Sequence, residues 1–74
     1  MARLSPVKAK VLIKFLQKKG FCEIRQKGSH KFFRHPNGRT TVVPYHPTCE
    51  IGPGLLRNIL NDAKVTPEEF KREK

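Results

Sequence analysis

The sequence has few of the residues that staple small proteins or anchor them in a membrane. Its 74 residues include two cysteines, Cys22 and Cys49, one methionine and no tryptophan. Two thiols do not form the disulfide framework of a small secreted domain, so they favour a reduced, cytoplasmic setting. No apolar run is long enough to span a bilayer, and Lys8 and Lys10 interrupt any signal-peptide core near the N-terminus. We therefore expect no membrane partner.

Length limits what the chain can enclose. A chain of this size predicts a single domain over residues 1–74, near the lower end of what folds without a staple. Its core is expected to supply a net stability of about 3–5 kcal/mol. Such a core does not wall off a deep substrate cavity, so any site is expected to be shallow and on the surface.

Acidic residues are scarce and unevenly placed. Lys and Arg number 16 against 6 Asp and Glu, a formal net charge of +10. Residues 1–49 hold 11 of the basic residues and one acid, Glu23, whereas residues 50–74 hold five of each. A field of this kind concentrates RNA, DNA or an acidic protein, and does so less at high salt. A basic surface that is merely solvated fits the same composition.

The N-terminal part reads as a basic amphipathic helix. Apolar residues recur at helical spacing between residues 7 and 16, with lysines on the other faces. Ser5 followed by Pro6 predicts the helix start, as N-cap and first helical residue. Gly20 predicts its left-handed stop.

A second helix is predicted over residues 53–63, where leucine and isoleucine keep the same spacing. A short helical turn with a frayed end is expected after it. Thr66 and Glu69 have the spacing of a capping box, and Val65 and Phe70 that of a hydrophobic staple.

Between the helices the chain alternates as β-structure does. The pattern predicts three sequential strands over residues 21–26, 29–34 and 40–43. Gly28 is expected at positive φ in the first turn. Asn37-Gly38 predicts a hairpin turn with two positive φ values. Residues 44–51 contain two prolines and are expected to form a loop.

The resulting order is α-β-β-β-α, an α+β fold. Its economical arrangement is a three-stranded antiparallel sheet with two helices on one face, which buries both apolar stripes. The other sheet face is then open to solvent or to a partner.

The central strand offers the main functional candidate, His30. Because side chains alternate across a strand, His30, Phe32 and Arg34 share one face, and Lys31 and Phe33 the other. We expect Phe33 in the core and His30 outward. Histidine changes charge near neutral pH and is the usual proton shuttle. Phe32 then offers a ring for base stacking or for a protein partner, although a partly covered edge aromatic is an equal alternative.

Basic side chains surround this histidine in the sequence. Those expected to bind a polyanion are Lys27, Lys31, Arg34 and Arg39. Ser29 either orients the imidazole or stabilises the turn.

The remaining histidines and cysteines have simpler interpretations. His46 is a candidate second proton donor or an ordinary loop residue, and His35 is expected to be structural. Only His46 and Cys49 have compact ligand spacing, so no metal site is predicted. Cys22 is expected to be a small core residue.

Several runs together resemble the HicA-type toxins of the HicA/HicB toxin–antitoxin systems. The central ones are residues 28–33 (the GSHxxF motif), 35–38, 42–44 and His46. Flanking matches occur at residues 20–21, 54–60 and 63–70. The resemblance covers nearly the whole chain. One departure is Leu55, where the family usually has threonine, which weakens the hydroxyl cap of the second helix.

The resemblance implies a double-stranded-RNA-binding-like fold. It further implies a type II toxin that acts as a translation-independent mRNA interferase, with His30 as its functional histidine and without a cofactor. A cognate HicB antitoxin is implied to bind the toxin and cover that site.

RNA carries its own nucleophile, the 2′-hydroxyl, so cleavage needs proton transfer and charge stabilisation more than a metal. His30 is the hypothesised general base or acid, with Lys31, Arg34 or Arg39 on the phosphate. The expected product is a 2′,3′-cyclic phosphate. Two other functions remain open: a non-catalytic RNA-binding module for duplex RNA, and a subunit whose basic face docks an acidic protein.

Overall fold

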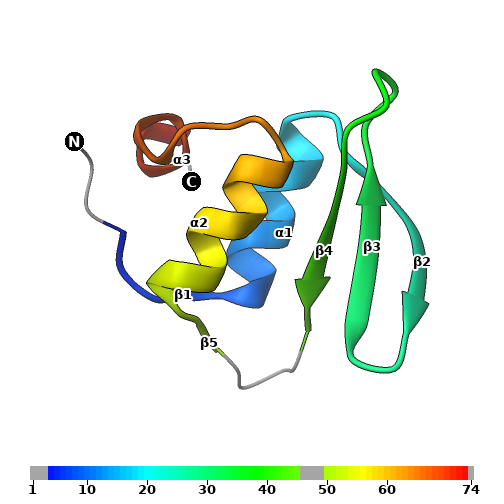
Figure 1. Ribbon diagram of the computed structural model, residues 1–74, viewed down its shortest axis with the longest axis horizontal. Helices are drawn as coiled ribbons and strands as arrows, with labels where there is room; N and C mark the ends of the chain where they lie inside the picture. Colours follow the sequence, from blue (N-terminus) through cyan, green and yellow to red (C-terminus); the bar gives the residue numbers. More distant parts are fainter. Residues whose placement is uncertain (1–3, 46–49, 74) are drawn as a thin grey trace.

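The computed structural model describes residues 4–45 and 50–73. Its elements follow in the order β1 (Val7–Lys8), α1 (Ala9–Lys18), β2 (Cys22–Lys27), β3 (His30–Arg34), β4 (Thr40–Pro44), β5 (Glu50–Ile51), α2 (Pro53–Asp62) and α3 (Pro67–Glu73). Strands β2, β3 and β4 form a three-stranded antiparallel meander. Both α1 and α2 lie on one side of this sheet (Figure 1). The predicted α+β fold is confirmed.

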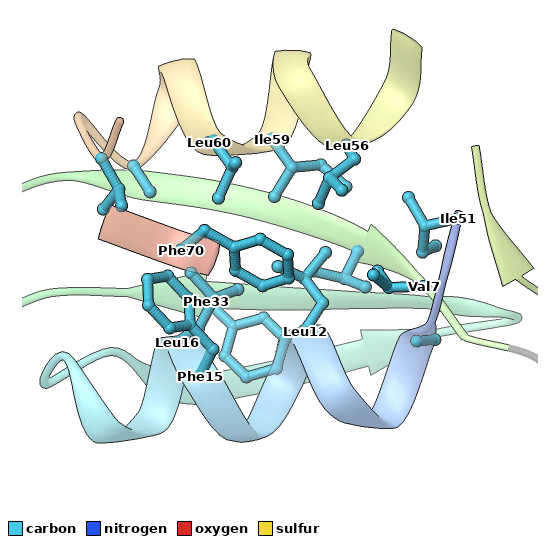
Figure 2. Close-up of a cluster of buried hydrophobic side chains, with 14 of the residues drawn as sticks. Val7, Leu12, Phe15, Leu16, Phe33, Ile51, Leu56, Ile59, Leu60 and Phe70 are labelled. Carbon is cyan, nitrogen blue, oxygen red and sulfur yellow. The ribbon is translucent and has the colours of Figure 1, made fainter. Parts of the chain in front are cut away.

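The core fills the space between the two long helices and the sheet. Figure 2 shows Leu12, Phe15 and Leu16 of α1 opposite Leu56, Ile59 and Leu60 of α2, with Phe33 and Phe70 between them. Phe33 is fully buried, as the alternation of β3 predicted. Burial of each such side chain contributes about 1.5–3 kcal/mol relative to exposure.

The start of α1 differs from the prediction. Val7 and Lys8 are extended and pair with Ile51 and Glu50, forming the short β1-β5 ladder. The helix therefore begins at Ala9, after Lys8 in an extended conformation and without a side-chain cap. The predicted Ser5 cap is wrong because the ladder takes the backbone that a first helical turn would need. The same ladder shows that part of the predicted loop over residues 44–51 is a strand.

The third helix is longer than expected. It runs to Glu73, whose carboxylate accepts a hydrogen bond of 2.7 Å from Lys19 at the end of α1. The turn that was expected to fray is helical as far as Glu73, and Lys74 lies outside the described residues. Its start follows the prediction, because the Glu69 N–H donates to the Thr66 hydroxyl at 3.1 Å.

Helix α2 begins after Gly52, with proline at its start and no side-chain cap. The cap position is Gly52, which has no side chain, and Leu55 is already the third residue of the helix, so the expected link between Leu55 and a weakened cap is not tested. The side chain of Leu55 is 43% exposed.

The two sheet turns use glycine differently. Gly28 has φ +58 between β2 and β3, as predicted. Between β3 and β4 only Gly38 has a positive φ, +98, so the predicted turn with two positive φ values is wrong. The Gly38 N–H donates to the His35 carbonyl at 2.9 Å, and the His35 N–H donates to the Arg39 carbonyl at 2.8 Å. Pro36 presets the first central position of this turn, and the glycine closes it.

A β-bulge in β2 decides which of its side chains share a face. Glu23 pairs with Phe33, but Arg25 pairs with Phe32, so Ile24 is an extra residue. Strict alternation would place Arg25 on the helix side of the sheet. The bulge turns it to the opposite side.

Cys22 is exposed at the start of β2, so its predicted place in the core is wrong. The reason is its pairing with Arg34, which directs both side chains away from the helices.

Candidate functional site

The side of the β2-β3-β4 sheet that points away from the helices is here called the open face. Residues paired across antiparallel strands point to the same side, and Phe33 and Val43 mark the helix side because both are fully buried. The open face consists of Cys22, Arg25, Lys27, His30, Phe32, Arg34, Thr40, Val42 and Pro44.

His30 lies at one end of this face as the first residue of β3, and its side chain is exposed. It pairs with Lys27 on one side and Pro44 on the other. The adjoining turn is tied to the end of β4, because the Tyr45 N–H donates to the Ser29 carbonyl at 2.6 Å. The imidazole is therefore reachable from solvent while its backbone is fixed by two neighbouring strands.

The open face is cationic and carries no carboxylate. Arg25, Lys27 and Arg34 all point to it. Glu23, the only acid in the first 49 residues, belongs to the helix side of the sheet, since it pairs with Phe33. The field at His30 is thus positive without compensation from the sheet itself, which favours an anionic ligand.

Lys31 does not join this group. Its ammonium forms an ion pair of 3.0 Å with Glu23 and lies 4.9 Å from the ring centre of Tyr45, on the helix side. The position does not support its predicted role beside His30.

Arg39 is also separate from His30. It lies past the hairpin at the other end of β3, a strand length of about 13 Å away. Its Nε donates to Asn37 at 3.1 Å and its Nη1 to the Ala63 carbonyl at 2.5 Å. The guanidinium also stands 5.2 Å from the Phe21 ring centre. These contacts give Arg39 a structural role that the sequence did not indicate.

Phe32 occupies the middle of the open face. Its side chain is half-buried between Arg25 of β2 and Val42 of β4. The Arg25 guanidinium carbon lies 4.6 Å from the centre of the Phe32 ring. Arg25 was missed by the sequence analysis because only the bulge at Ile24 brings it to this side.

The other residues that the sequence singled out have different environments. His35 is structural, as predicted: its Nδ1 accepts a hydrogen bond of 3.1 Å from the Asn37 N–H, and its ring packs 5.2 Å from Phe21. Ser29 is half-buried in the turn before His30. His46 and Cys49 lie outside the described residues.

The open face is shallow. Its hollow, about 340 Å³, is lined by Cys22, Ile24, Arg34, His35 and Pro36. Within residues 4–45 and 50–73, no three His, Cys, Asp or Glu side chains gather as metal ligands. What the face offers is a basic surface with one histidine and one aromatic ring, over which a polymer can lie.

Comparison with known families agrees with this fold. The family described as HicA toxin of bacterial toxin–antitoxin matches residues 9–65, from the start of α1 to the segment before α3. No individual curated protein matches the chain. The matched segment contains α1, α2 and the meander of a small double-stranded-RNA-binding-like fold, including His30. The chain therefore belongs to the HicA family, the toxins of bacterial toxin–antitoxin systems.

Proposed function

We propose that this toxin is an endoribonuclease that cleaves messenger RNA, with His30 as its proton-transfer group. The observation that carries the proposal is an exposed histidine on a cationic sheet face that has no carboxylate. Membership of the family supplies the toxin role and an antitoxin partner. We further propose a type II system in which the partner is a HicB-type protein that covers the open face.

The chemistry requires only groups that lie on this face. The 2′-hydroxyl of the RNA attacks the adjacent phosphorus, and the bond to the 5′-oxygen of the next nucleotide breaks. His30 either accepts the proton of the 2′-hydroxyl or donates one to the departing 5′-oxygen, and solvent completes the other transfer. The products are a 2′,3′-cyclic phosphate and a 5′-hydroxyl. One such group contributes about 10²–10⁴-fold to the rate.

Lys27 is the cation best placed to assist this step. It pairs directly with His30 across β2 and β3, so both side chains leave the sheet from adjacent positions. Its charge offsets the negative charge that develops on the phosphate. Arg34 lies four residues further along β3. It is proposed to bind the RNA backbone at a point distant from the bond that is cleaved. Ser29 is proposed to orient the imidazole.

The proposed reaction takes no step through a metal or an organic cofactor, because the 2′-hydroxyl is part of the substrate. Among residues 4–45 and 50–73 no helix has the length and apolarity needed to cross a bilayer. We propose that the toxin acts in the cytoplasm, where messenger RNA is found.

The test is cleavage of an end-labelled single-stranded RNA in EDTA by the chain and by His30→Ala. Arg57→Ala on α2 serves as a control for an exposed residue remote from the open face. We expect the His30 variant to lose at least about 100-fold in rate while its circular dichroism is unchanged. Equal cleavage by both chains, or products ending in a 3′-hydroxyl, would contradict the proposal. Binding by both without cleavage favours the non-catalytic RNA-binding module.

A further inference from the structure

The contact between Arg25 and Phe32 is distinct from the group around His30. Arg25 lies over the ring of Phe32 at 4.6 Å, in the middle of the sheet. No salt bridge joins Arg25 to a carboxylate in residues 4–45 and 50–73. Arg25 instead contacts an aromatic ring, which attracts the cation through its quadrupole without neutralising it.

We propose that Arg25 and Phe32 form a nucleobase subsite, in which one unpaired base of a single-stranded RNA stacks on the Arg25 guanidinium. This inference rests on the proposed function, since it names where that substrate is held. Arg25 is a positioning residue of the site, and Phe32 supports it from below.

The choice of a base over a phosphate follows from what surrounds Arg25. Guanidinium planes and aromatic rings are the surfaces on which proteins stack unpaired bases. A phosphate contact needs a cation that extends into solvent, as Lys27 does, and needs no ring beneath it. The ring limits the positions that the guanidinium adopts, so less conformational entropy is lost when a base binds.

The local backbone supports a dedicated role. The bulge at Ile24 interrupts the β2-β3 ladder and turns Arg25 to the side where Phe32 lies. Without it Arg25 would face the helices, where Lys10 and Lys14 of α1 already line a groove together with Lys31. Bulges of this kind re-aim a side chain at the expense of regular pairing.

The subsite lies beside the proton-transfer position. Phe32 follows His30 by two residues on the same face of β3, a separation of about 7 Å. That distance corresponds to one or two nucleotides of a strand that crosses the open face. A duplex keeps its bases paired and stacked, so it gains the charge of Arg25 but not its stacking surface, and the subsite favours single-stranded RNA.

The experiment measures coupling between Arg25 and a base. A fluorescent single-stranded RNA is titrated into the His30→Ala chain, which prevents cleavage, and the series is repeated with one abasic nucleotide moved along the RNA. We expect one abasic position to weaken binding by on the order of 5- to 100-fold. In Arg25→Lys that penalty disappears, because the charge is kept but the planar stacking surface is lost. In Phe32→Leu the penalty becomes smaller, because Arg25 remains but loses the ring that holds its guanidinium in place. Arg57→Lys on α2 is the matched control and keeps the penalty.

The outcomes separate this inference from the proposed function. If Arg25→Lys retains the full abasic penalty, or no position shows one, the subsite is overturned even when the unsubstituted chain cleaves RNA. If the penalty depends on Arg25 but the chain never cleaves, the subsite stands and the nuclease proposal fails. Absence of any RNA binding overturns both.

Discussion

The ring of Phe70 meets the ring of Phe15 edge-on, with centroids 4.9 Å apart and planes at 89°. Both side chains are almost completely buried, at 1% and 2% exposure. Figure 2 shows Phe70 reaching between the two long helices. The short helix α3 is therefore part of the core, and it lies outside the segment matched to the family, residues 9–65.

Truncation of Phe70 should cost most of the stability of the domain. Phe70→Ala removes a buried ring and leaves a cavity, at a cost of about 3–5 kcal/mol. A core of this size supplies only about that much net stability. We expect Phe70→Ala to be largely unfolded at 25 °C, and Phe70→Leu to stay folded with a lower urea midpoint. A loss below about 1 kcal/mol for the alanine variant would mean that α3 contributes little to the fold.

The ion pairs of Lys19 with Glu69 and Glu73 should make stability depend on pH at both extremes. The hydrogen bonds that Lys19 donates to Glu69 and Glu73 raise its pKa above the ordinary 10.5. The hydrogen bond from Lys19 lowers the pKa of Glu73 below its ordinary 4.5. The stabilisation from Glu73 is therefore present above pH 4.5 and is lost as the pH falls through its lower folded value. That from Lys19 is present below pH 10.5 and is lost as the pH rises through its higher folded value.

Urea midpoints between pH 2 and pH 7 test the acid side. We expect Glu73→Gln to be less stable than the unsubstituted chain at pH 7, and the difference to shrink as the pH falls and the carboxylate becomes protonated in both states. Asp62→Asn at the end of α2 controls for removal of an exposed carboxylate. A difference that stays constant across this range would show that the pair is not formed.

Removal of the Thr41 hydroxyl should increase the stability of the protein. The residue is 3% exposed on the helix side of β4, and its Oγ1 has no hydrogen-bond partner among residues 4–45 and 50–73. A buried hydroxyl without a partner carries a desolvation cost of about 1–3 kcal/mol. We expect Thr41→Val, which has nearly the same shape, to raise the free energy of unfolding by about 1 kcal/mol. Thr40→Val, one residue away on the open face, should change it by less than about 0.5 kcal/mol. Destabilisation by Thr41→Val would reveal a partner for the hydroxyl.

The parts of the site that follow from local pattern could be predicted from the sequence. Alternation along β3 is sufficient to place Phe33 in the core and His30 outside, because the strand is regular and one of its faces is covered by helices. The positive φ of Gly28 likewise depends on the turn alone.

The parts of the structure that depend on distant segments of the chain could not be predicted from the sequence. The bulge at Ile24 arises from how β2 meets β3, and it reverses the face of Arg25 without any local signal. The β1-β5 ladder joins residues more than forty positions apart, and it replaces a helix start that Ser5 and Pro6 favour locally. The contact of Arg39 with the Ala63 carbonyl has the same character, since it ties a hairpin to the end of α2.

Lys27 and Lys31 lie on opposite sides of the sheet, and their alanine variants should therefore differ in how salt affects RNA binding. A lysine that contacts a phosphate contributes about 0.7 to the slope of log K against log salt for single-stranded RNA. Lys27 points to the open face, so Lys27→Ala should weaken binding at low salt and lower the slope by roughly that amount. Lys31 is paired with Glu23 at 3.0 Å on the helix side, so Lys31→Ala should leave the slope unchanged.

Both variants remove one positive charge. If RNA binding depended only on the total charge of the protein, the slope of log K against log salt would fall equally in both. That result would contradict the assignment of RNA to the open face. Lys31→Ala also leaves Glu23 without its partner, at a stability cost of about 0.2–1 kcal/mol. Titrations in the His30→Ala background at four salt concentrations, with folding checked at each, distinguish the outcomes. A larger loss of slope for Lys31→Ala than for Lys27→Ala would place the RNA on the helix side, in the groove of about 450 Å³ that Lys31 lines together with Lys10 and Lys14.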